Sequence, residues 1–131
     1  MKQPNTFVYV AGPYRPKDGT HDWRGYFEID AHIAEARKWS SALAEAGIPF
    51  FCPHLNSAHF EIIVPKVPSQ YWLDMDLVIL RYASALLLLP GWRDSRGTVV
   101  EKDQAHEQGK DVYTHAMFPQ LVREWYAAGA S

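Results

Sequence analysis

Residues 85–110 read ALLLLPGWRDSRGTVVEKDQAHEQGK, and this stretch decides the fold class. The apolar run Ala85–Leu89 is too short to span a membrane and has the length of a buried strand. A Pro-Gly pair ends the run, a polar loop follows, and the segment from Gly97 to Gln108 predicts a helix. The order strand, loop, helix is typical of α/β folds, in which ligands bind beside the loops that leave the carboxyl ends of the strands.

The same alternation of strand and helix patterns extends through the chain. Strands are predicted at residues 7–11, 48–52, 85–89 and 111–114, and helices at residues 28–46, 69–81, 97–108 and 119–127, with Ser69 as an N-cap. Residues 14–25 predict a polar loop, and residues 54–68 an irregular segment with a brief strand or turn at 60–64. We therefore expect one domain over residues 1–131: an α/β, Rossmann-like (flavodoxin-like) three-layer sandwich with a mostly parallel sheet of four to five strands.

Composition excludes several classes of partner. The net charge of −2 gives no electrostatic footprint for a polynucleotide or an acidic membrane. Cys52 is the only cysteine, so no intrachain disulfide can form. The first 13 residues hold too short an apolar stretch for a signal peptide, and no segment reaches transmembrane length. We expect a cytoplasmic protein that binds a small molecule.

The common nucleotide and hydrolase motifs are absent from the sequence. There is no GxxxxGK[ST] phosphate loop, no GxGxxG fingerprint and no GxSxG nucleophile elbow. Cys52, His54 and His59 have the spacing C-x-H-x4-H, which matches no common zinc pattern. We expect neither a cofactor nor a metal ion.

Two carboxylates are the remaining candidates for chemistry. Glu101 lies four residues after Gly97, in the first or second turn of its helix, and Asp76 lies between apolar neighbours in the preceding helix. The first could equally be a solvated glutamate near the positive end of a helix, and the second a surface acid. If the two converged on a sugar, they could divide nucleophilic and proton-transfer roles. The residues alone do not show that they converge.

Three stretches together resemble the nucleoside 2-deoxyribosyltransferase superfamily. They are FVYVAGPYR at residues 7–15, AGIPFFCPH at 46–54, and DLVILRYASALLLLPGWRDSRGTVVEKDQAHEQGK at 76–110. The most specific part is S-x-G-x-x-x-E followed by A-x-x-x-G-K behind an apolar strand. The chain is most similar to the small, phage- and bacteria-type branch with an AGPYRP start. The superfamily also includes deoxynucleoside 5′-monophosphate N-glycosidases.

The resemblance implies a role for each matching residue. Glu101 takes the place of the nucleophile that attacks the anomeric carbon, and Asp76 that of the acid that handles the proton of the leaving base. Ser95 and Arg15 match positions near a 5′-phosphate. Tyr9, Gly12 and Tyr14 match the first-strand region that borders the sugar and the base.

Further residues are candidates because of their positions at the predicted sheet edge. At Gly97 the backbone N–H groups at the start of the helix could bind an anion. Trp92 could stack on a base or cap the end of the strand. Asp94 could face a ligand or shape a turn. His54 and Asn56 follow the second strand and could touch substrate. The chain departs from the family pattern at Ser84, where an Asp is frequent, and at Val99, where a small residue is common.

We expect an enzyme that cleaves the N-glycosidic bond of a (deoxy)nucleoside or nucleoside 5′-monophosphate by hydrolysis or base transfer. The alternative is a nucleotide-binding or sensing module of the same fold without turnover, which Ser84 and Val99 favour. A weaker alternative is a structural subunit whose Trp-rich tail serves assembly. The resemblance also implies a homo-oligomer (a dimer or higher), for which Phe118–Tyr126 is one candidate contact.

Overall fold

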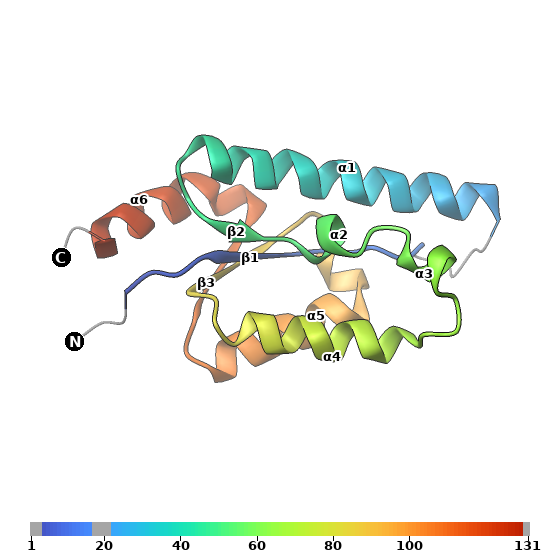
Figure 1. Ribbon diagram of the computed structural model, residues 1–131. Coiled ribbons are helices and arrows are strands. Elements are labelled where there is room, and N and C mark those ends of the chain that lie inside the picture. The colour runs from blue at the N-terminus through green and yellow to red at the C-terminus, as the bar shows by residue number, and fades with distance from the viewer. Residues whose placement is uncertain (1–3, 17–21, 130–131) are drawn as a thin grey trace.

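The computed structural model describes residues 4–16 and 22–129, and in these residues it is an α/β sandwich (Figure 1). Its described part contains one sheet, with four strands in the order β2-β1-β3-β4. The strands are β1 (Val8–Ala11), β2 (Phe50–Phe51), β3 (Ala85–Leu88) and β4 (Asp111–Thr114), and each neighbouring pair is parallel. This is the flavodoxin-like order, so the predicted fold class is confirmed. From β1, the chain adds β2 on one side of the sheet and then β3 and β4 on the other, so the direction of strand addition reverses between β1 and β3.

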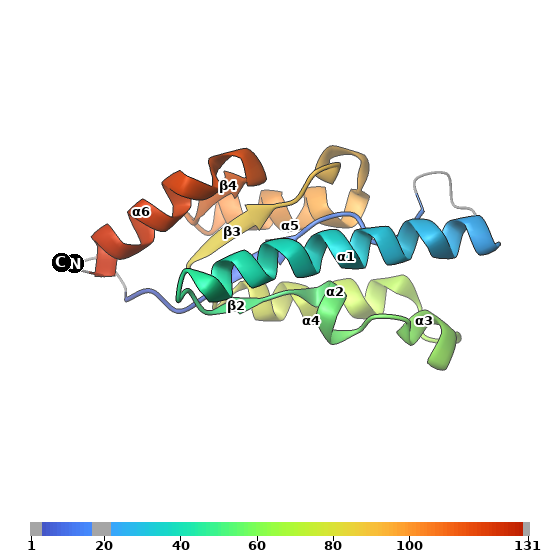
Figure 2. The ribbon, with the colours of Figure 1, turned by 90° about the horizontal axis from the view of Figure 1, so that it is seen from above.

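Helices cover both faces of the sheet. The helices α1 (Trp23–Glu45) and α6 (Phe118–Gly129) lie on one face, with α1 along β1 and β2 and α6 on the β4 side (Figures 1 and 2). The other face is covered by α4 (Ser69–Leu80) and α5 (Arg96–Glu107). Single turns complete the described chain, namely α2 (Pro53–Asn56), α3 (Phe60–Ile63), η1 (Trp92–Asp94) and η2 (His115–Met117).

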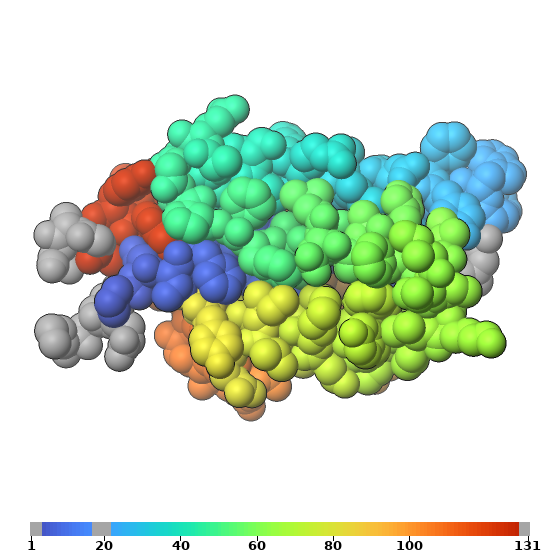
Figure 3. All heavy atoms as spheres, in the orientation of Figure 1, coloured from blue at the N-terminus to red at the C-terminus, as the bar shows by residue number. Residues whose placement is uncertain are grey.

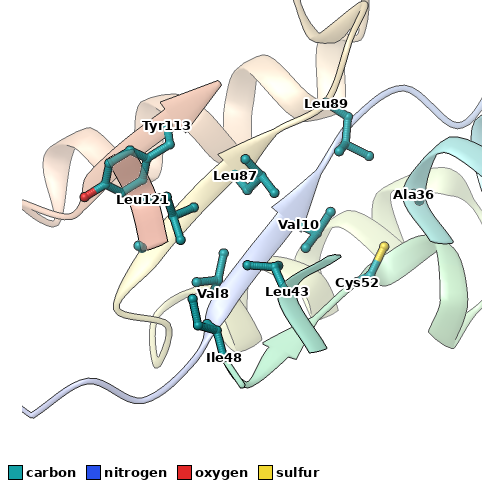
Figure 4. Packing of buried hydrophobic residues seen from close by; sticks show 11 residues of the cluster. Val8, Val10, Ala36, Leu43, Ile48, Cys52, Leu87, Leu89, Tyr113 and Leu121 are labelled. Carbon is teal, nitrogen blue, oxygen red and sulfur yellow. The ribbon is translucent and has the colours of Figure 1, made fainter. Parts of the chain in front are cut away.

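Alternation along the two central strands divides the core into two clusters. Successive strand residues point to opposite faces, so Val8 and Val10 pack with α1 and α6, as do Ala85 and Leu87 (Figure 4). Their neighbours pack on the other face, against Leu80 of α4 and Ala105 of α5; these neighbours are Tyr9, Ala11, Leu86 and Leu88. Because Tyr9 alternates with Val8 and Val10 along β1, its side chain lies on the face that α4 and α5 cover.

The first helix begins earlier than the sequence pattern predicts. Residues 14–25 were expected to form a loop, but α1 starts at Trp23, because the Asp22 carboxylate caps it by accepting the Arg24 backbone N–H at 2.9 Å. Gly25 is buried and lies four residues before Ile29, so it belongs to the buried face of this helix rather than to a loop. The part of the expected loop at residues 17–21 lies outside the described residues.

The segment between β2 and α4 is also more regular than predicted. Pro53 opens α2, as proline does at a first helical position, and α3 takes the place of the expected strand or turn. His59 precedes α3 with a left-handed φ of 64°. The prediction of Ser69 as an N-cap is wrong by one residue, because Pro68 occupies the cap and Ser69 is the first helical residue. In Figure 3 the atoms of residues 48–67 (green) lie between α1 and α4.

Gly12 is required by the packing of the strands. A Cβ at this position would lie 2.7 Å from the Cβ of Leu89, and the latter cannot move away by changing rotamer. Without a side chain at Gly12, the backbone after β1 can pass close to Leu89, which follows β3. The loop after β1 therefore lies at the point where the strand order reverses.

The C-terminal helix packs on the domain itself. Leu121 is fully buried, and Phe118, Val122 and Trp125 pack against the cluster on the α1 face. The Tyr126 hydroxyl donates a hydrogen bond to the Ala46 carbonyl at the end of α1. The apolar face of α6 thus covers its own sheet. No helix in the described ranges has both the length and the apolar composition that a membrane crossing requires.

Candidate functional site

A cavity of about 670 Å³ opens at the carboxyl ends of β1 and β3. Its walls come from the loop after β1, from α1, from the α2–α3 segment, from the first two turns of α4, and from residues 90–98. Asp76 and Glu101 both line it. Ligands of open parallel sheets bind at this switch point, and the volume is within the range of about 300–1,000 Å³ that is common for small-molecule sites.

Helix periodicity brings the two carboxylates under the sheet. Asp76 lies four residues before the buried Leu80 on α4, and Glu101 lies four residues before the buried Ala105 on α5. Residues four apart share one helix face, so each acid points toward the layer that contains Tyr9. Asp76 and Glu101 converge on one cavity: each lines it, and the Asp76 charge acts on the pKa of Glu101.

Glu101 is an acid held out of water. Its side chain is 7% exposed, and its Oε2 accepts a hydrogen bond from the Tyr9 hydroxyl. Burial raises the pKa of Glu101 to about 8, the Tyr9 hydrogen bond acts in the opposite direction, and the nearby Asp76 adds to the rise. Burial and the two acids raise the pKa of Tyr9 well above its ordinary value, so this hydroxyl stays protonated and donates.

Asp76 has no partner for one of its carboxyl oxygens. The residue is 9% exposed, and Oδ1 is buried without a hydrogen bond from any described residue. Burial raises the pKa of Asp76 to about 7. A buried polar atom without a partner is costly, and near neutral pH this carboxyl group can either hold or release a proton.

The amino end of α5 gives the cavity an electropositive side. Ser95 caps the helix: its Oγ accepts the Thr98 backbone N–H at 3.3 Å and the Thr98 hydroxyl at 2.8 Å. The N–H groups of Arg96 and Gly97 have no acceptor within a helix, because they belong to its first turn. A Cβ at Gly97 would meet nothing within 4 Å, so the backbone is open to a ligand there.

Two arginines line the cavity. Arg96 is the first residue of α5, and Arg15 leaves the loop after β1 and donates from Nη2 to the Ser69 Oγ at 3.3 Å, at the amino end of α4. Both are exposed. Together with the open amides of α5 they could hold an anionic group of a ligand.

Another part of the wall carries aromatic rings. Phe60 of α3 and Trp72 of α4 both line the cavity, and their rings meet edge to face with centroids 5.4 Å apart at 87°. Tyr14, in the loop after β1, contacts this wall: its hydroxyl lies 2.9 and 3.0 Å from the two carboxylate oxygens of Glu61. A flat apolar group fits against such a wall.

A family model described as a domain of unknown function (DUF1937) matches residues 6–117 of the 131-residue chain. The chain belongs to the DUF1937 family. The DUF1937 match spans β1 to η2 and so includes both carboxylates, whereas α6 lies outside it. The description of DUF1937 names no activity, and the resemblance to nucleoside 2-deoxyribosyltransferases stays a prediction. Among proteins with curated descriptions, none matches the chain.

The structure of this DUF1937 chain brings most of the predicted site residues together. Tyr9 reaches the cavity floor through Glu101. The other predicted residues that line the cavity are Gly12, Tyr14, Arg15, His54, Asp76, Asp94, Ser95, Gly97 and Glu101. Ser95 and His54 also have hydrogen-bond partners within the protein. The hydroxyl of Ser95 is engaged by Thr98, and His54 is 5% exposed with Nε2 donating to the Pro13 carbonyl at 2.8 Å.

Two predicted residues do not line the cavity. Asn56 is exposed at the end of α2, and the next residue, Ser57, lines the wall in its place. Trp92 packs its ring against the core cluster below β3, with the Arg93 guanidinium 5.1 Å and the Lys102 ammonium 5.4 Å from its centroid. Trp92 therefore has the capping role at the strand end that was its alternative.

The two departures from the family pattern also lie away from the cavity. Ser84 precedes β3 at its amino end, where its Oγ accepts the Thr6 backbone N–H at 2.6 Å. Val99 is half-buried on α5 and is not part of the cavity wall. Neither residue changes the lining of the site.

Only Asp76 on α4 was identified from the sequence as a site residue, and the other residues of the same helix face were missed. Ser69, Trp72, Leu73 and Asp76 line the cavity at positions i, i+3, i+4 and i+7, which are neighbours on one helix face. This spacing was a readable signal. Glu61 and His32 also line the wall, but no local pattern marks them, because their roles depend on contacts with Tyr14.

No three His, Cys, Asp or Glu side chains among the described residues form a group that could hold a metal ion.

We predict that the two buried acids make stability fall as pH rises. Their pKa values in the folded protein exceed the ordinary 4.5 and 3.8, so between about pH 4 and 8 the folded state binds more protons than the unfolded state. The stability that this provides at low pH is lost as pH rises through the folded pKa values. Glu101→Gln removes the part of this loss that is due to Glu101, and its advantage over the wild type in free energy of unfolding should grow by on the order of 2 kcal/mol between pH 4.5 and 8.

Urea unfolding followed by circular dichroism at pH 4.5, 6 and 8 measures this difference. Glu107→Gln is the matched control, because Glu107 lies on the same helix and is exposed. A difference between Glu101→Gln and the wild type that stays constant over the three pH values contradicts the assignment of Glu101 as a buried titrating acid.

Proposed function

We propose that this protein cleaves the N-glycosidic bond of a (deoxy)nucleoside or nucleoside 5′-monophosphate, through a glycosyl-enzyme ester on Glu101, by hydrolysis or base transfer. The observation that carries the proposal is the pair of buried carboxyl groups, Glu101 and Asp76, that share the floor of one cavity at the switch point of the sheet. Most glycoside hydrolases break the glycosidic bond with two carboxyl groups that flank it.

In the first step, the Glu101 carboxylate attacks the anomeric carbon and the bond from that carbon to the base nitrogen breaks. The electron pair leaves with the base, and the Asp76 carboxyl group gives the base its proton. The products of this step are the free base and a glycosyl ester of Glu101.

In the second step, a water molecule or the nitrogen of another base attacks the anomeric carbon of the ester. The bond to the Glu101 oxygen breaks, and the Asp76 carboxylate accepts the proton of the attacking group. The free sugar or a new nucleoside leaves, and both acids return to their starting protonation states. One site therefore serves hydrolysis and transfer.

The electrostatics of the pair keep a proton within the site near neutral pH. Burial raises the pKa of both groups toward neutrality, and the Asp76 charge raises that of Glu101 further. The pKa of Glu101, about 8, exceeds that of Asp76, about 7, so the shared proton favours Glu101 in the resting site, and attack on the sugar requires that this proton move to Asp76. The Tyr9 hydroxyl donates to Glu101 and stabilises the charge that Glu101 carries once the proton has moved.

The electropositive side of the cavity supports a 5′-phosphate on the substrate. Arg15, Arg96 and the open N–H groups at the start of α5 all line the cavity that holds the two acids. The aromatic wall of Phe60 and Trp72 comes from α3 and α4 and suits the base. This arrangement favours a nucleoside 5′-monophosphate over a free nucleoside.

A module that binds nucleotides without turnover is the alternative. The residues that favoured it in the sequence, Ser84 and Val99, lie outside the cavity lining. The buried acids cost stability at neutral pH, and a binding module would gain nothing from that cost. The assay below separates the two functions.

We expect the wild type to release free base from at least one member of a panel of nucleosides and nucleoside 5′-monophosphates, with or without a second base, as followed by liquid chromatography. Glu101→Gln should lower the rate at least about 10³-fold because the nucleophile is lost. Asp76→Asn should lower it by about 10²–10⁴-fold because the proton donor is lost. Binding of the panel members without any base release favours the alternative instead, and full activity of Glu101→Gln refutes the proposal.

The matched controls for these variants are Glu107→Gln on α5 and Asp74→Asn on α4. Both residues are exposed, and an asparagine at position 74 still accepts the hydrogen bond that the Gln70 amide donates to Asp74 at 2.7 Å. Each control should keep the wild-type rate within about twofold, because neither side chain lines the cavity.

Arg96 and Arg93 provide a second pair of matched variants. Arg96 lines the cavity, whereas Arg93 stacks on Trp92 outside the lining. Arg96→Gln should raise the KM for a nucleoside 5′-monophosphate about 10-fold and leave that for the free nucleoside unchanged, because one charged contact to the phosphate is lost. Arg93→Gln should change neither value. An equal effect of the two variants would argue against a phosphate contact at Arg96.

We also propose that the protein is a homo-oligomer, as the resemblance implies. The packing of α6 on its own core argues against the expected contact between subunits at Phe118–Tyr126. Large apolar side chains are instead exposed at the start of α1 and on α3, with Trp23 67%, Phe27 68% and Ile63 66% exposed. Light scattering should give at least twice the chain mass of 15.0 kDa, and a monomer would contradict the proposal.

A further inference from the structure

The α2–α3 segment forms one wall of the cavity, yet little apolar burial holds it in place. The helix α3 has a single turn, which is not stable alone. Its side chains Ile62 and Ile63 are 52% and 66% exposed, and the residue before it, His59, has a left-handed φ of 64°, which costs about 1 kcal/mol or more. The position of this wall must therefore depend on polar contacts.

Tyr14 supplies the main polar contacts of α3. Its hydroxyl donates to the Glu61 carboxylate at 2.9–3.0 Å and accepts the His59 backbone N–H at 2.8 Å. These contacts lie at the first turn of α3 and are partly buried. The His59 imidazole also lies 3.3 Å from Asp30 on α1, but both of these side chains are exposed, so this pair contributes little.

Two histidines fix Tyr14 itself. The carbonyl of Tyr14 accepts from Nδ1 of His32 on α1 at 2.9 Å, and the carbonyl of Pro13 accepts from Nε2 of His54 on α2 at 2.8 Å. The Tyr14 ring also meets the His54 ring edge to face at 5.6 Å. The loop after β1 is thus tied to α1 and α2, and the Tyr14 hydroxyl extends this network to α3.

We infer that Tyr14 is a positioning residue whose hydroxyl holds α3 so that Phe60, beside Trp72, presents its ring to the base of the substrate. The reference to a base rests on the proposed function. Phe60 is 38% exposed and directly precedes Glu61, so the hydrogen bond to Glu61 sets the place of Phe60 as well. Because the hydroxyl already has an acceptor and a donor within the protein, Tyr14 acts through α3 rather than on the substrate.

The inference separates binding of the base from the chemical step. Neither Glu101 nor Asp76 contacts Tyr14 in the described hydrogen bonds, and Tyr9 holds Glu101 independently of α3. Loss of the Tyr14 hydroxyl should therefore weaken contacts with the base and leave kcat unchanged.

The first test uses the ligand-free protein. Tyr14→Phe keeps the ring and loses both hydrogen bonds, and amide hydrogen exchange in a peptide that covers residues 59–64 should become about 10-fold faster. Exchange in residues 97–107 should not change. Tyr82→Phe is the control, because Tyr82 is 65% exposed and does not line the cavity. Unchanged exchange at residues 59–64 in Tyr14→Phe overturns the inference.

The second test uses calorimetric binding of two probes, adenosine 5′-monophosphate and ribose 5-phosphate. Tyr14→Phe should bind the first about 10-fold more weakly and the second as the wild type does, because ribose 5-phosphate has no base. Equal weakening of both probes would show a direct contact with the sugar or phosphate and overturn the inference. Wild-type protein that binds neither probe also overturns the link to a base, whatever the exchange result.

Variants of Glu61 test whether the hydrogen bond, rather than the tyrosine ring, has this effect. Glu61→Gln keeps an oxygen that accepts from the Tyr14 hydroxyl and should retain wild-type exchange and binding. Glu61→Leu removes the acceptor and should reproduce Tyr14→Phe. Where base release is measurable, both Tyr14→Phe and Glu61→Leu should raise KM with kcat unchanged. Absence of base release in the wild type would refute the proposed function, and the exchange data would still decide the role of Tyr14.

Discussion

The hydrogen bond from Tyr9 to Glu101 joins the central strand of the sheet to α5 beneath it, and the geometry of the site depends on it. Glu101 is only 7% exposed, so its ionised form has lost most of its contact with water and needs a donor within the protein. Tyr9 is fully buried and provides that donor. Its side chain can do so because residue 9 points to the α4–α5 face of β1, whereas its neighbours in the strand point to the α1 face.

Asp76 adds a second constraint to the same layer. It lies on α4 where Leu80, one turn later, is in the core, and it keeps one buried oxygen without a partner from the described residues. Apolar side chains at positions 76 and 101 would serve the core better, since burial raises the pKa of both acids and reduces stability near neutral pH. Groups of this kind are concentrated at sites where chemistry needs them. The fold accepts this loss where the strand order reverses and a cavity opens.

Local patterns predicted the architecture and made Glu101 and Asp76 candidates, whereas their roles were implied only by the family resemblance. The apolar runs at β1 and β3, each ended by glycine and proline residues, gave the central strands, and the spacing from Glu101 to Ala105 and from Asp76 to Leu80 determines which helix faces carry the acids. The Ser95 position was also found from sequence. Its hydroxyl is used by Thr98 as a helix cap, and sequence position alone could not distinguish a cap from a ligand contact.

The remaining features depend on contacts between residues far apart in the chain. The α2–α3 segment has no strong periodicity, and its shape follows from contacts to Tyr14, which is 45 residues before His59 and 47 before Glu61. The start of α1 was missed because Gly25 was interpreted as a loop residue, although it belongs to the buried face. Asn56 and Trp92 were assigned to the site from their place after strands, but side-chain direction, which sequence position does not give, turns them away from it.

The central claim is that Glu101 forms a covalent bond to the sugar. A 2′-deoxy-2′-fluoro nucleoside 5′-monophosphate tests it directly, because the fluorine destabilises the positively charged transition states and slows breakdown of the ester. Mass spectrometry of the protein after incubation should show the added mass of the fluorinated sugar phosphate, and peptide mapping should locate it on Glu101. Release of base from this compound without an adduct at Glu101, or with an adduct on another residue, would contradict the account.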